Sequence, residues 1–435
     1  MLDIRFIREN AQLVEEKAEQ KGFKVDIKHL LQLDDDRRKL LTEIETVRAE
    51  RNKLAEQLRD KKPAQKEVIQ GQGLKKKLKK LELELEPVEK DYETLLKAVP
   101  NMPADDVPVG ATEADNVIAK EWGQKPKFGF QPKTHWEIAE TRGLIDKDRA
   151  AKIAGSRFAY IQGDLVKLQF ALIQFVLDVL TNEDTIKKVT QEAGLKNVSS
   201  EPFTPVLPPA MIRTDVFDAM DRLEPQEERY QVGPLEDNLW LQGSAEHTLG
   251  PIYMNEILPA EMLPIRFLGY VTSFRREAGS YGKDIEGIIR MHQFDKLEME
   301  SFTTAEDGMK EHLFMVAIQE YLMQQLKIPY HVLHKCTADI GKPNARGIDI
   351  EAWLPGHNKY LETHTADYMT DYQARRLQTR IKNDKGRVEL VHTNDATAFA
   401  MGRTMVAIIE NYQRENGSFE VPEALRSYMH GQKTI

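Results

Sequence analysis

The chain has 435 residues, of which 41% are hydrophobic and 30% charged, with one cysteine and a net charge of −9. A single cysteine excludes an internal disulfide and a zinc site built from several cysteines, and no apolar run is long enough to span a membrane. The first residues, MLDIRFIREN, lack the apolar core of a signal peptide. These features predict a cytoplasmic protein with two or three domains.

Two segments near the N-terminus carry apolar side chains at alternating steps of four and three residues, over Leu40–Leu58 and Leu74–Val99. This spacing gives each helix one apolar stripe, and two such helices bury their stripes against each other in an antiparallel coiled coil. The residues between the segments include three that break helices: Pro63, Gly71 and Gly73. The pattern therefore predicts a helical hairpin that reverses over residues 59–73.

The predicted tip of this hairpin is strongly basic. Between Arg59 and Lys80 the sequence has nine basic residues and two acidic ones, a local net charge of +7, which leaves −16 for the rest of the chain. A charge run alone is more typical of a solvated helix face, and heptads alone also fit an oligomerisation coiled coil. Neither alternative explains why the lysines concentrate at the far end of a hairpin, so the distribution favours contact with a nucleic acid.

A linker follows the predicted hairpin. The segment 99–110 contains three prolines, which disfavour regular structure. We expect a domain boundary here, with a helical arm over 1–105 and a mixed helix and strand domain over 106–435.

The mixed domain begins with short elements. A β-rich run surrounds Phe158–Gln162, and an amphipathic helix is predicted over Leu165–Leu180. The string FTPVLPPAMI (Phe203–Ile212) then predicts a strand, and its two adjacent prolines place that strand at the edge of a sheet or at a subunit boundary.

The segment Gly269–Met299 predicts two strands joined by a long loop. The strands are expected over Tyr270–Phe274 and Ile288–Phe294, with Arg275 and Arg290 at the ends next to the loop. A guanidinium group gives a phosphate two parallel, permanently charged hydrogen bonds. Because hairpin loops of unusual length tend to be functional, the two arginines indicate a phosphate site.

Several strings resemble one family: FRREAGSYGKD (274–284), RMHQFDKLE (290–298), TDYQARRL (370–377), GRTMVAIIENYQ (402–413), PNMPADDVPVG (100–110), AAKIAGSRF (150–158) and YLET (360–363). They are similar to the signatures of seryl-tRNA synthetases of the bacterial type, which belong to class II. The resemblance covers essentially the whole chain. It implies an α+β fold, in which an N-terminal antiparallel two-helix coiled-coil arm precedes an antiparallel β-sheet core flanked by helices.

The resemblance also implies a reaction. The protein would activate L-serine with ATP, release pyrophosphate, and transfer serine from the seryl-adenylate to the 3′-terminal adenosine of tRNA(Ser), as a homodimer that uses Mg²⁺. tRNA(Sec) is a second candidate acceptor. No zinc is expected, because the zinc-dependent form would use a cysteine ligand, and no membrane partner is expected.

The resemblance assigns the nucleotide to named residues. Arg275 would hold the α-phosphate and the serine carboxylate, Arg290 the pyrophosphate end, and Glu277 the adenine amino group. Phe294 and Arg403 would stack on the two adenine faces, and Arg275, Arg290 and Arg403 would be the catalytic arginines. The remaining ATP-binding residues would be Arg276, Met291, Glu362, Thr363, His364 and Thr365, of which Glu362 and Thr365 would also coordinate Mg²⁺.

The resemblance likewise assigns the amino acid and the tRNA. Glu298 would bind the serine hydroxyl and ammonium, Thr397 the hydroxyl, and the segment Ser244-Ala245-Glu246 the ammonium. Asp395 would lie beside them. The tRNA would be contacted by lysines of the arm: Lys61, Lys62, Lys75, Lys76 and Lys79.

The sequence departs from the family pattern near the predicted serine pocket. His247-Thr248 replaces the usual Val-Pro, Thr365-Ala366-Asp367-Tyr368 replaces a Ser-Cys-Ser-Asn-like string, and Asp395 replaces an asparagine. A carboxylate near Glu298 would raise one pKa or require a cationic partner. His364 and His392 are candidates for that partner.

Two alternatives are weighed against the ligase. A paralogue that activates an amino acid for another carrier would have lost the arm, which this chain keeps. A non-catalytic RNA-binding protein would have no need to keep Arg275, Glu277, Glu298, Glu362 and Arg403 together.

Overall fold

The computed structural model describes residues 1–435 except 60, 62, 279–286 and 384. The chain divides into two compact units, Met1–Met102 and Pro103–Ile435. Among the described helices, none combines the length and the apolar composition that crossing a bilayer would require.

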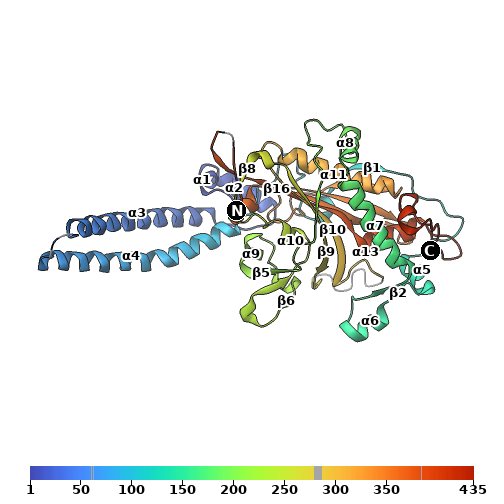
Figure 1. Ribbon diagram of the computed structural model, residues 1–435, viewed down its shortest axis with the longest axis horizontal. Coiled ribbons are helices and arrows are strands. Elements are labelled where there is room, and N and C mark those ends of the chain that lie inside the picture. Colours follow the sequence, from blue (N-terminus) through green and yellow to red (C-terminus); the bar gives the residue numbers. More distant parts are fainter. Residues whose placement is uncertain (60, 62, 279–286, 384) are drawn as a thin grey trace. The chain divides into compact units, whose positions relative to one another are not determined.

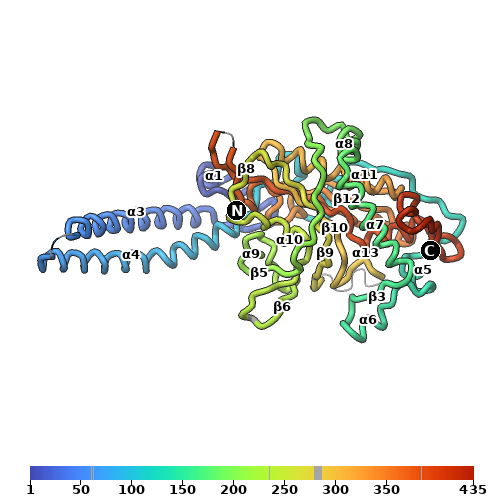
Figure 2. Tube along the Cα trace, viewed as in Figure 1, coloured from blue at the N-terminus to red at the C-terminus, as the bar shows by residue number. Residues whose placement is uncertain are grey.

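The described residues of the first unit form four helices: α1 (Ile4–Glu9), α2 (Ala11–Gln20), α3 (Ile27–Gln57) and α4 (Gln65–Ala98). Figure 2 shows α3 and α4 side by side along their length. Their shared core contains Ile44 and Val47 of α3 and Leu78 and Leu81 of α4, all buried. The predicted antiparallel coiled coil is therefore confirmed.

Two ion pairs give the direction of this packing. Arg37 of α3 contacts Glu89 of α4 at 3.0 Å, and Arg48, further along α3, contacts Glu82 at 2.9 Å. The later residue of α3 therefore pairs with the earlier residue of α4, so the two helices run antiparallel. The Arg48–Glu82 pair is exposed and the Arg37–Glu89 pair partly so, and such surface pairs contribute little stability beside the buried stripe.

The turn between α3 and α4 is shorter than predicted. The chain reverses between the end of α3 and Gln65, inside the predicted range 59–73, but Gly71 and Gly73 lie within α4, so the predicted extent of the turn is wrong from Gln65 onward. A glycine costs a helix about 1 kcal/mol relative to alanine, which long-range packing can offset. At the helix start, Glu67 accepts a hydrogen bond of 2.7 Å from the Ala64 amide.

The predicted tRNA-contacting lysines consequently separate into two groups. Lys61 lies in the turn, whereas Lys75, Lys76 and Lys79 lie exposed on α4. Lys62 lies outside the described residues.

The second unit contains an eight-stranded sheet (Figure 1). In spatial order its strands are β1 (Val117–Trp122), β11 (Tyr330–His334), β12 (Arg346–Leu354), β13 (Lys359–Thr370), β16 (His392–Ala400), β10 (Gln293–Thr303), β9 (Ile265–Phe274) and β4 (Thr204–Val206). Every neighbouring pair is antiparallel except β4 with β9. The predicted α+β class with an antiparallel core is confirmed.

Three helices pack on one face of this sheet: α7 (Asp164–Leu180), α11 (Gly308–Gln325) and α13 (Met401–Asn411). Leu297 and Met299 of β10 and Ala396 and Ala398 of β16 join the same core. Side chains of a strand alternate between its two faces, so the residues between them project to the opposite face. The functional side chains of β10 and β16 lie there.

The remaining elements are short. The helices are α5 (His135–Arg142), α6 (Lys147–Ala154), α8 (Glu183–Glu192), α9 (Thr214–Ala219), α10 (Glu246–Leu249) and α12 (Tyr372–Leu377). The strands are β2 (Ile145–Asp146), β3 (Tyr160–Ile161), β5 (Met211–Arg213), β6 (Gln231–Val232), β7 (Leu239–Leu241), β8 (Ile257–Pro259), β14 (Arg380–Lys382) and β15 (Val388–Leu390).

Several local predictions can be compared with these elements. The amphipathic helix corresponds to α7, and the run near Phe158–Gln162 corresponds to β3. The predicted strand over Phe203–Ile212 is interrupted at its two prolines and forms β4 and β5 instead. β4 lies at the edge of the large sheet, as expected for a strand next to prolines.

The second strand of the predicted hairpin begins later than expected. β10 starts at Gln293, so a strand over Ile288–Phe294 is wrong for its first five residues. Ile288, Ile289 and Met291 are buried, yet the backbone here bonds outside the ladder, with the Ile288 amide donating to the His135 ring. A run of apolar side chains alone cannot distinguish a buried strand from a buried segment that lies outside the sheet.

Candidate active site

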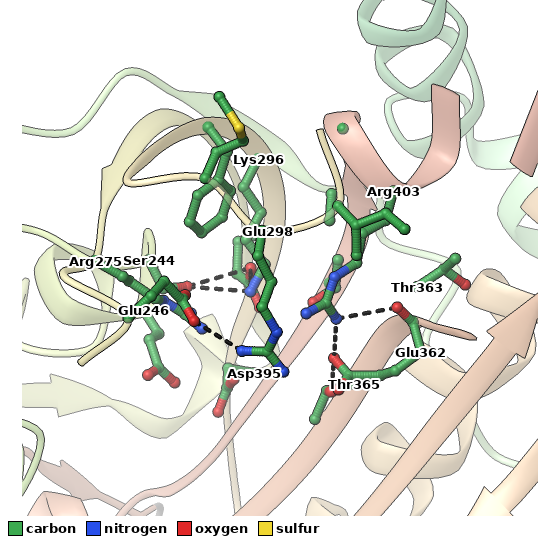
Figure 3. Close-up of a pocket in the computed structure, with 18 of the residues that line it drawn as sticks. Ser244, Glu246, Arg275, Lys296, Glu298, Glu362, Thr363, Thr365, Asp395 and Arg403 are labelled. Carbon is green, nitrogen blue, oxygen red and sulfur yellow. Dashed lines mark hydrogen bonds and ion pairs between the residues drawn. The ribbon is translucent and has the colours of Figure 1, made fainter. Parts of the chain in front are cut away.

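A cavity of about 370 Å³ opens on the face of the sheet opposite α7, α11 and α13. Its walls come from the ends of β9 and β10, from β13 and β16, from the start of α13, and from the segment between residues 222 and 247. It brings together most of the predicted site residues: Ser244, Glu246, Arg275, Glu277, Arg290, Met291, Phe294, Glu298, Glu362, Thr363, Thr365, Asp395, Thr397 and Arg403. Figure 3 shows Arg403 and Glu362 on one side and Ser244, Glu246 and Arg275 on the other.

Three predicted residues do not line the cavity: Ala245, Arg276 and His364. Ala245 is fully buried against Leu249 and β9. Arg276 lies over the Tyr230 ring, 5.5 Å from its centroid, and lines a neighbouring hollow.

The position of His364 follows from an irregularity in β13. The register with β12 shifts between Glu362 and His364, so Thr363 is an extra residue in the ladder. A bulge of this kind breaks the alternation of a strand. Glu362 and Thr365 therefore both face the cavity, while the His364 ring packs 5.6 Å from the Phe399 ring of the core.

The cavity holds the three arginines assigned above to the nucleotide, each anchored by a protein acceptor. Arg275 Nε donates to the Gly243 carbonyl at 2.9 Å, and its guanidinium lies 5.4 Å from the Phe294 ring centre. Arg290 Nη1 lies 2.8 Å from Glu277 Oε2. Such anchors hold guanidinium groups in place before a phosphate arrives.

Arg403 and Glu362 form the third anchor. Arg403 Nη1 donates to the Glu362 carboxylate at 2.7 Å and to its carbonyl at 3.0 Å. Burial alone would raise the pKa of Glu362, but Arg403 and Lys335 outweigh it and lower the pKa to about 2. The ionised Oε1 lies 3.3 Å from the Thr365 hydroxyl, an oxygen pair of the kind that hard cations bind.

The segment that follows the long loop is held at Ile288 by a clamp of three side chains, His135, His357 and Glu410, that the sequence did not indicate. The Ile288 amide donates to His135 Nε2 at 3.3 Å, so the other ring nitrogen donates to Glu410 of α13, at 3.2 Å. His357 Nδ1 also contacts Glu410, at 2.7 Å. Among the described residues these three side chains form the one group whose ligand atoms are close enough for a metal ion. Both His135 ring nitrogens already have partners, which favours a structural clamp over a metal site.

The same cavity carries the residues predicted to bind the amino acid. Glu298 is buried and in contact with Lys296, and it accepts from the Ser244 hydroxyl at 3.3 Å. Burial raises the pKa of Glu298, although Lys296 opposes the shift. The Lys296 ammonium also donates to Ser244, at 3.2 Å.

The negative charge of Glu246 is balanced by Arg222, which no motif in the sequence indicated. Arg222 contacts the two carboxylate oxygens at 3.0 and 3.1 Å, and His247 contacts one at 3.2 Å. Burial would raise the pKa of Glu246, but Arg222 and His247 hold it well below its ordinary value. Arg222 reaches the cavity from a loop remote in sequence, so no motif contains it.

Asp395 shows both effects expected of a further carboxylate near Glu298, a raised pKa and a cationic neighbour. Burial raises its pKa well above the ordinary value, with Glu246 and Asp367 adding to the shift. Its nearest cation is Arg222, at 3.8 Å. The two histidines proposed for this role lie elsewhere, since His364 faces the core and His392 bonds the Tyr368 hydroxyl at 2.7 Å.

Other lining residues were also missed: Arg229, His247, Lys296, Lys335 and Asp367. Lys296 lies inside a quoted string, and His247 and Asp367 were noticed only as departures from a pattern. Lys335 follows β11 and had no signal of its own.

Comparison with known proteins identifies two matching family models. The seryl-tRNA synthetase N-terminal domain matches residues 1–103, and the tRNA synthetase class II core domain (G, H, P, S and T) matches residues 230–412. The serine–tRNA ligases of Syntrophotalea carbinolica and Geotalea uraniireducens are each 39% identical over 440 residues, which cover 100% of both chains.

Two solved structures are also similar over the full chain. The seryl-tRNA synthetase from Pyrococcus horikoshii, complexed with ATP, has a TM-score of 0.86 and 35% identity, and the match covers 100% of this chain and 99% of that one. The cytoplasmic serine–tRNA ligase from Naegleria fowleri, in complex with AMP, has a TM-score of 0.84 and 26% identity, with 100% and 98% covered.

Proposed function

The chain belongs to the seryl-tRNA synthetase family, and we propose that it is a serine–tRNA ligase. In this proposal L-serine and ATP form seryl-adenylate and pyrophosphate, and the seryl group is then transferred to the 3′-terminal adenosine of tRNA(Ser). The observation that carries the proposal is one cavity that holds the anchored arginines together with the buried Glu298.

The first step would depend on positioning rather than on a protein nucleophile. Arg275 would bind the α-phosphate and the serine carboxylate together, so the attacking oxygen lies in line with the phosphorus. Arg290 and Arg403 would stabilise charge on the departing pyrophosphate and on the nucleotide. Glu277 would bind the adenine amino group, and Phe294 and Arg403 would enclose the ring.

Glu362 and Thr365 would hold Mg²⁺, which neutralises phosphate charge when bound. This part of the proposal is supported by the ionised Glu362 carboxylate next to the Thr365 hydroxyl.

The serine side chain would be read by Glu298 and Thr397, with the ammonium near Ser244 and Glu246. A buried carboxylate that accepts from a hydroxyl discriminates against alanine, which would leave it without that donor. The site would therefore select serine over alanine by a hydrogen bond rather than by size.

The first unit would bind tRNA, and residues 106–435 would form the catalytic domain. The proposal is supported by the exposed lysines of α4 and by the basic segment around them. tRNA(Sec) is a second acceptor to test. A cytoplasmic location fits the single, buried Cys336.

A homodimer is proposed for the active form. It is supported by apolar side chains exposed on α7 and next to the edge strand β4, which was predicted to lie at a sheet edge or a subunit boundary: Phe170 of α7 is 61% exposed and Leu207 is 81% exposed. Sedimentation at micromolar concentration should give twice the mass of one chain. A monomer at that concentration would contradict the proposal.

The central test is serine-dependent exchange of pyrophosphate into ATP, followed by charging of tRNA(Ser). We expect exchange with serine and none above background without an amino acid. Exchange without charging would favour the paralogue that uses another carrier. No exchange with any amino acid would leave only the non-catalytic alternative.

A further inference from the structure

A row of acidic side chains crosses β13, β16 and β10, next to Glu298 and Thr397, which are proposed to bind serine. Asp367 of β13 lies opposite Asp395 of β16, and Asp395 lies opposite Glu300 of β10. Their exposed fractions are 8%, 6% and 0%. Like charges directly opposite each other destabilise a sheet, and a buried carboxyl without a partner costs more than an exposed one. Burial of these three carboxyl groups therefore lowers the stability of the folded state unless another group offsets it.

Four other carboxylates of the cavity each have a close cation. Glu246 pairs with Arg222, Glu298 with Lys296, Glu362 with Arg403 and Glu277 with Arg290. These four pairs leave the acidic row as the group of carboxyls in and beneath the cavity wall with fewer close cations than carboxyl groups.

The row itself has no comparable cation among the described residues. Asp395 is 3.8 Å from Arg222, which is already engaged by Glu246, and Lys335 lies nearer to Asp349, at 3.5 Å. The Oδ1 atoms of Asp395 and Asp367 and both oxygens of Glu300 have no hydrogen-bond partner within the described part of the chain. Asp395 and Asp367 also line the cavity, so a bound molecule can reach them.

A chelated metal ion does not account for the row. Within the described part of the chain, only the His135, His357 and Glu410 group places three ligand atoms within 4.8 Å of one another. A serine hydroxyl does not account for it either, because it brings one proton, and Glu298 already lies beside Thr397 to receive it. An ammonium group brings three donors and a positive charge.

We propose that the amino-acid end of the cavity accepts a short amino acid whose side chain ends in an ammonium group, directed toward Asp395 and Asp367. The substrate class is the diamino acids with side chains of about the length of serine, of which 2,3-diaminopropionate is the closest in shape. Burial raises the pKa of both aspartates, so a cationic side chain would supply the charge that keeps them ionised.

This inference rests on the proposed function only for the activation step. The carboxylate of the diamino acid attacks the α-phosphorus of ATP, the bond to the pyrophosphate oxygen breaks, and pyrophosphate leaves with that electron pair. The products are the aminoacyl-adenylate and pyrophosphate, and the side-chain ammonium is not consumed.

The test is pyrophosphate exchange by the full chain with two matched pairs of amino acids and alanine. The pairs are serine with 2,3-diaminopropionate, and homoserine with 2,4-diaminobutyrate, which differ by an ammonium in place of a hydroxyl. We expect at least one diamino acid to support exchange with kcat/KM within about tenfold of serine, and alanine to be at least about a hundredfold poorer.

The outcomes separate the two proposals. Exchange with serine, and diamino acids no better than alanine, would overturn this inference and leave the proposed function standing. No exchange with serine or with any diamino acid would overturn both. Exchange with a diamino acid but not with serine would support this inference and overturn the assignment of serine.

Two variants then locate the recognition. Asp395→Asn and Asp367→Asn keep the shape of the side chain and remove its negative charge, so the ratio of kcat/KM for the diamino acid to that for serine should fall at least about tenfold. Asp307→Asn, at a partly exposed position paired with Lys310 and outside the cavity, is the matched control and should leave this ratio unchanged. An unchanged ratio in both cavity variants would overturn the assignment. If neither variant folds, as judged by its thermal transition, the amino-acid panel on the unaltered chain decides.

Discussion

The charge of each acidic residue in the cavity is decided by its neighbours as much as by its burial. Glu246 is buried and Glu362 is partly exposed, and Arg222 and Arg403 keep the two carboxylates ionised. Asp395 is buried like Glu246, yet it shares one arginine with Glu246, and its pKa is raised. The same type of side chain therefore has opposite charge preferences within one cavity, because the cations are unevenly distributed.

Arg403→Lys should reduce serine-dependent pyrophosphate exchange. The guanidinium donates to two oxygens of Glu362, at 2.7 and 3.0 Å, and is expected to cover the adenine face. A lysine ammonium cannot provide a planar surface or this fork. We expect kcat/KM to fall roughly a hundredfold. Arg387→Lys, at an exposed position between β14 and β15, should retain full activity. Equal activity of both variants would contradict the role of Arg403.

His247→Gln should make the catalytic unit less sensitive to acid. Burial lowers the pKa of His247 to about 4, although Glu246 opposes the shift. The folded state thus holds the neutral ring, while the unfolded chain binds a proton below about pH 6.5, so stability is lost as pH falls from 6.5 toward 4. Between pH 7 and pH 5 this costs the unaltered protein about 2 kcal/mol, a loss that the variant should not share.

Urea denaturation followed by tryptophan fluorescence can measure this difference. All four tryptophans lie in the second unit, at positions 122, 136, 240 and 353, so the signal does not report the helical arm. The measured quantity is the change in unfolding free energy from pH 7 to pH 5 in each protein. Equal changes in the two proteins would show that His247 is not held neutral by the fold.

At the scale of elements, the cavity depends on how strands and helices present their side chains. β10 places apolar residues toward α7, α11 and α13 and polar residues toward the cavity by alternation, and β16 does so up to Ala398, the extra residue at a register shift with β10. The bulge at Thr363 breaks that alternation in β13 and brings Glu362 and Thr365 to the same side. Helix α13 contributes at both ends, with Arg403 in the cavity and Glu410 in the clamp on His135.

Gly73→Ala should stabilise the helical arm, because Gly73 lies inside α4 and not in a turn. A Cβ atom at this position would have no heavy atom within 4 Å. Alanine is favoured over glycine in a helix interior by about 1 kcal/mol. Hydrogen exchange of the α4 amides that open with the helix should therefore slow about fivefold.

Gly22→Ala provides the contrasting control. Gly22 has a φ of +80°, a conformation that alanine adopts only with strain, so this change should destabilise the arm. If Gly73→Ala accelerated exchange as well, residue 73 would have to lie in a turn, as the sequence had suggested.

At the scale of the whole molecule, charge is distributed unequally along the chain. The net charge is −9, yet the segment from Arg59 to Lys80 carries +7. An acidic protein repels a polyanion on average, so binding of tRNA would depend on this local segment. Adenylate formation needs no tRNA and would depend on the second unit alone.

Replacing Lys75, Lys76 and Lys79 together by glutamine should weaken tRNA charging and spare pyrophosphate exchange. Each lost phosphate contact also reduces the dependence of binding on salt, so the slope of log affinity against log salt should decrease by up to about two or three. Glutamine at three other exposed lysines of the first unit, Lys28, Lys39 and Lys90, is the matched control. Equal charging by the two triple variants would contradict a role of the basic segment in binding tRNA.

The sequence by itself determined the features that depend on local periodicity. Heptad spacing predicted α3 and α4, an amphipathic pattern predicted α7, and the resemblance of several short strings to the seryl-tRNA synthetase family implied the residues that gather in one cavity. Each of these signals is contained within one stretch of chain, because a helix or a strand exposes its apolar face at a fixed period.

The tertiary structure decided which groups meet and which side each one faces. Arg222 reaches Glu246 and Asp395 from a separate loop, and His135 binds the Ile288 amide across more than a hundred residues of chain. The bulge at Thr363 turned His364 away from the cavity. Such pairings follow from the packing of distant segments, and the charge of a buried carboxyl depends on the cation that this packing supplies.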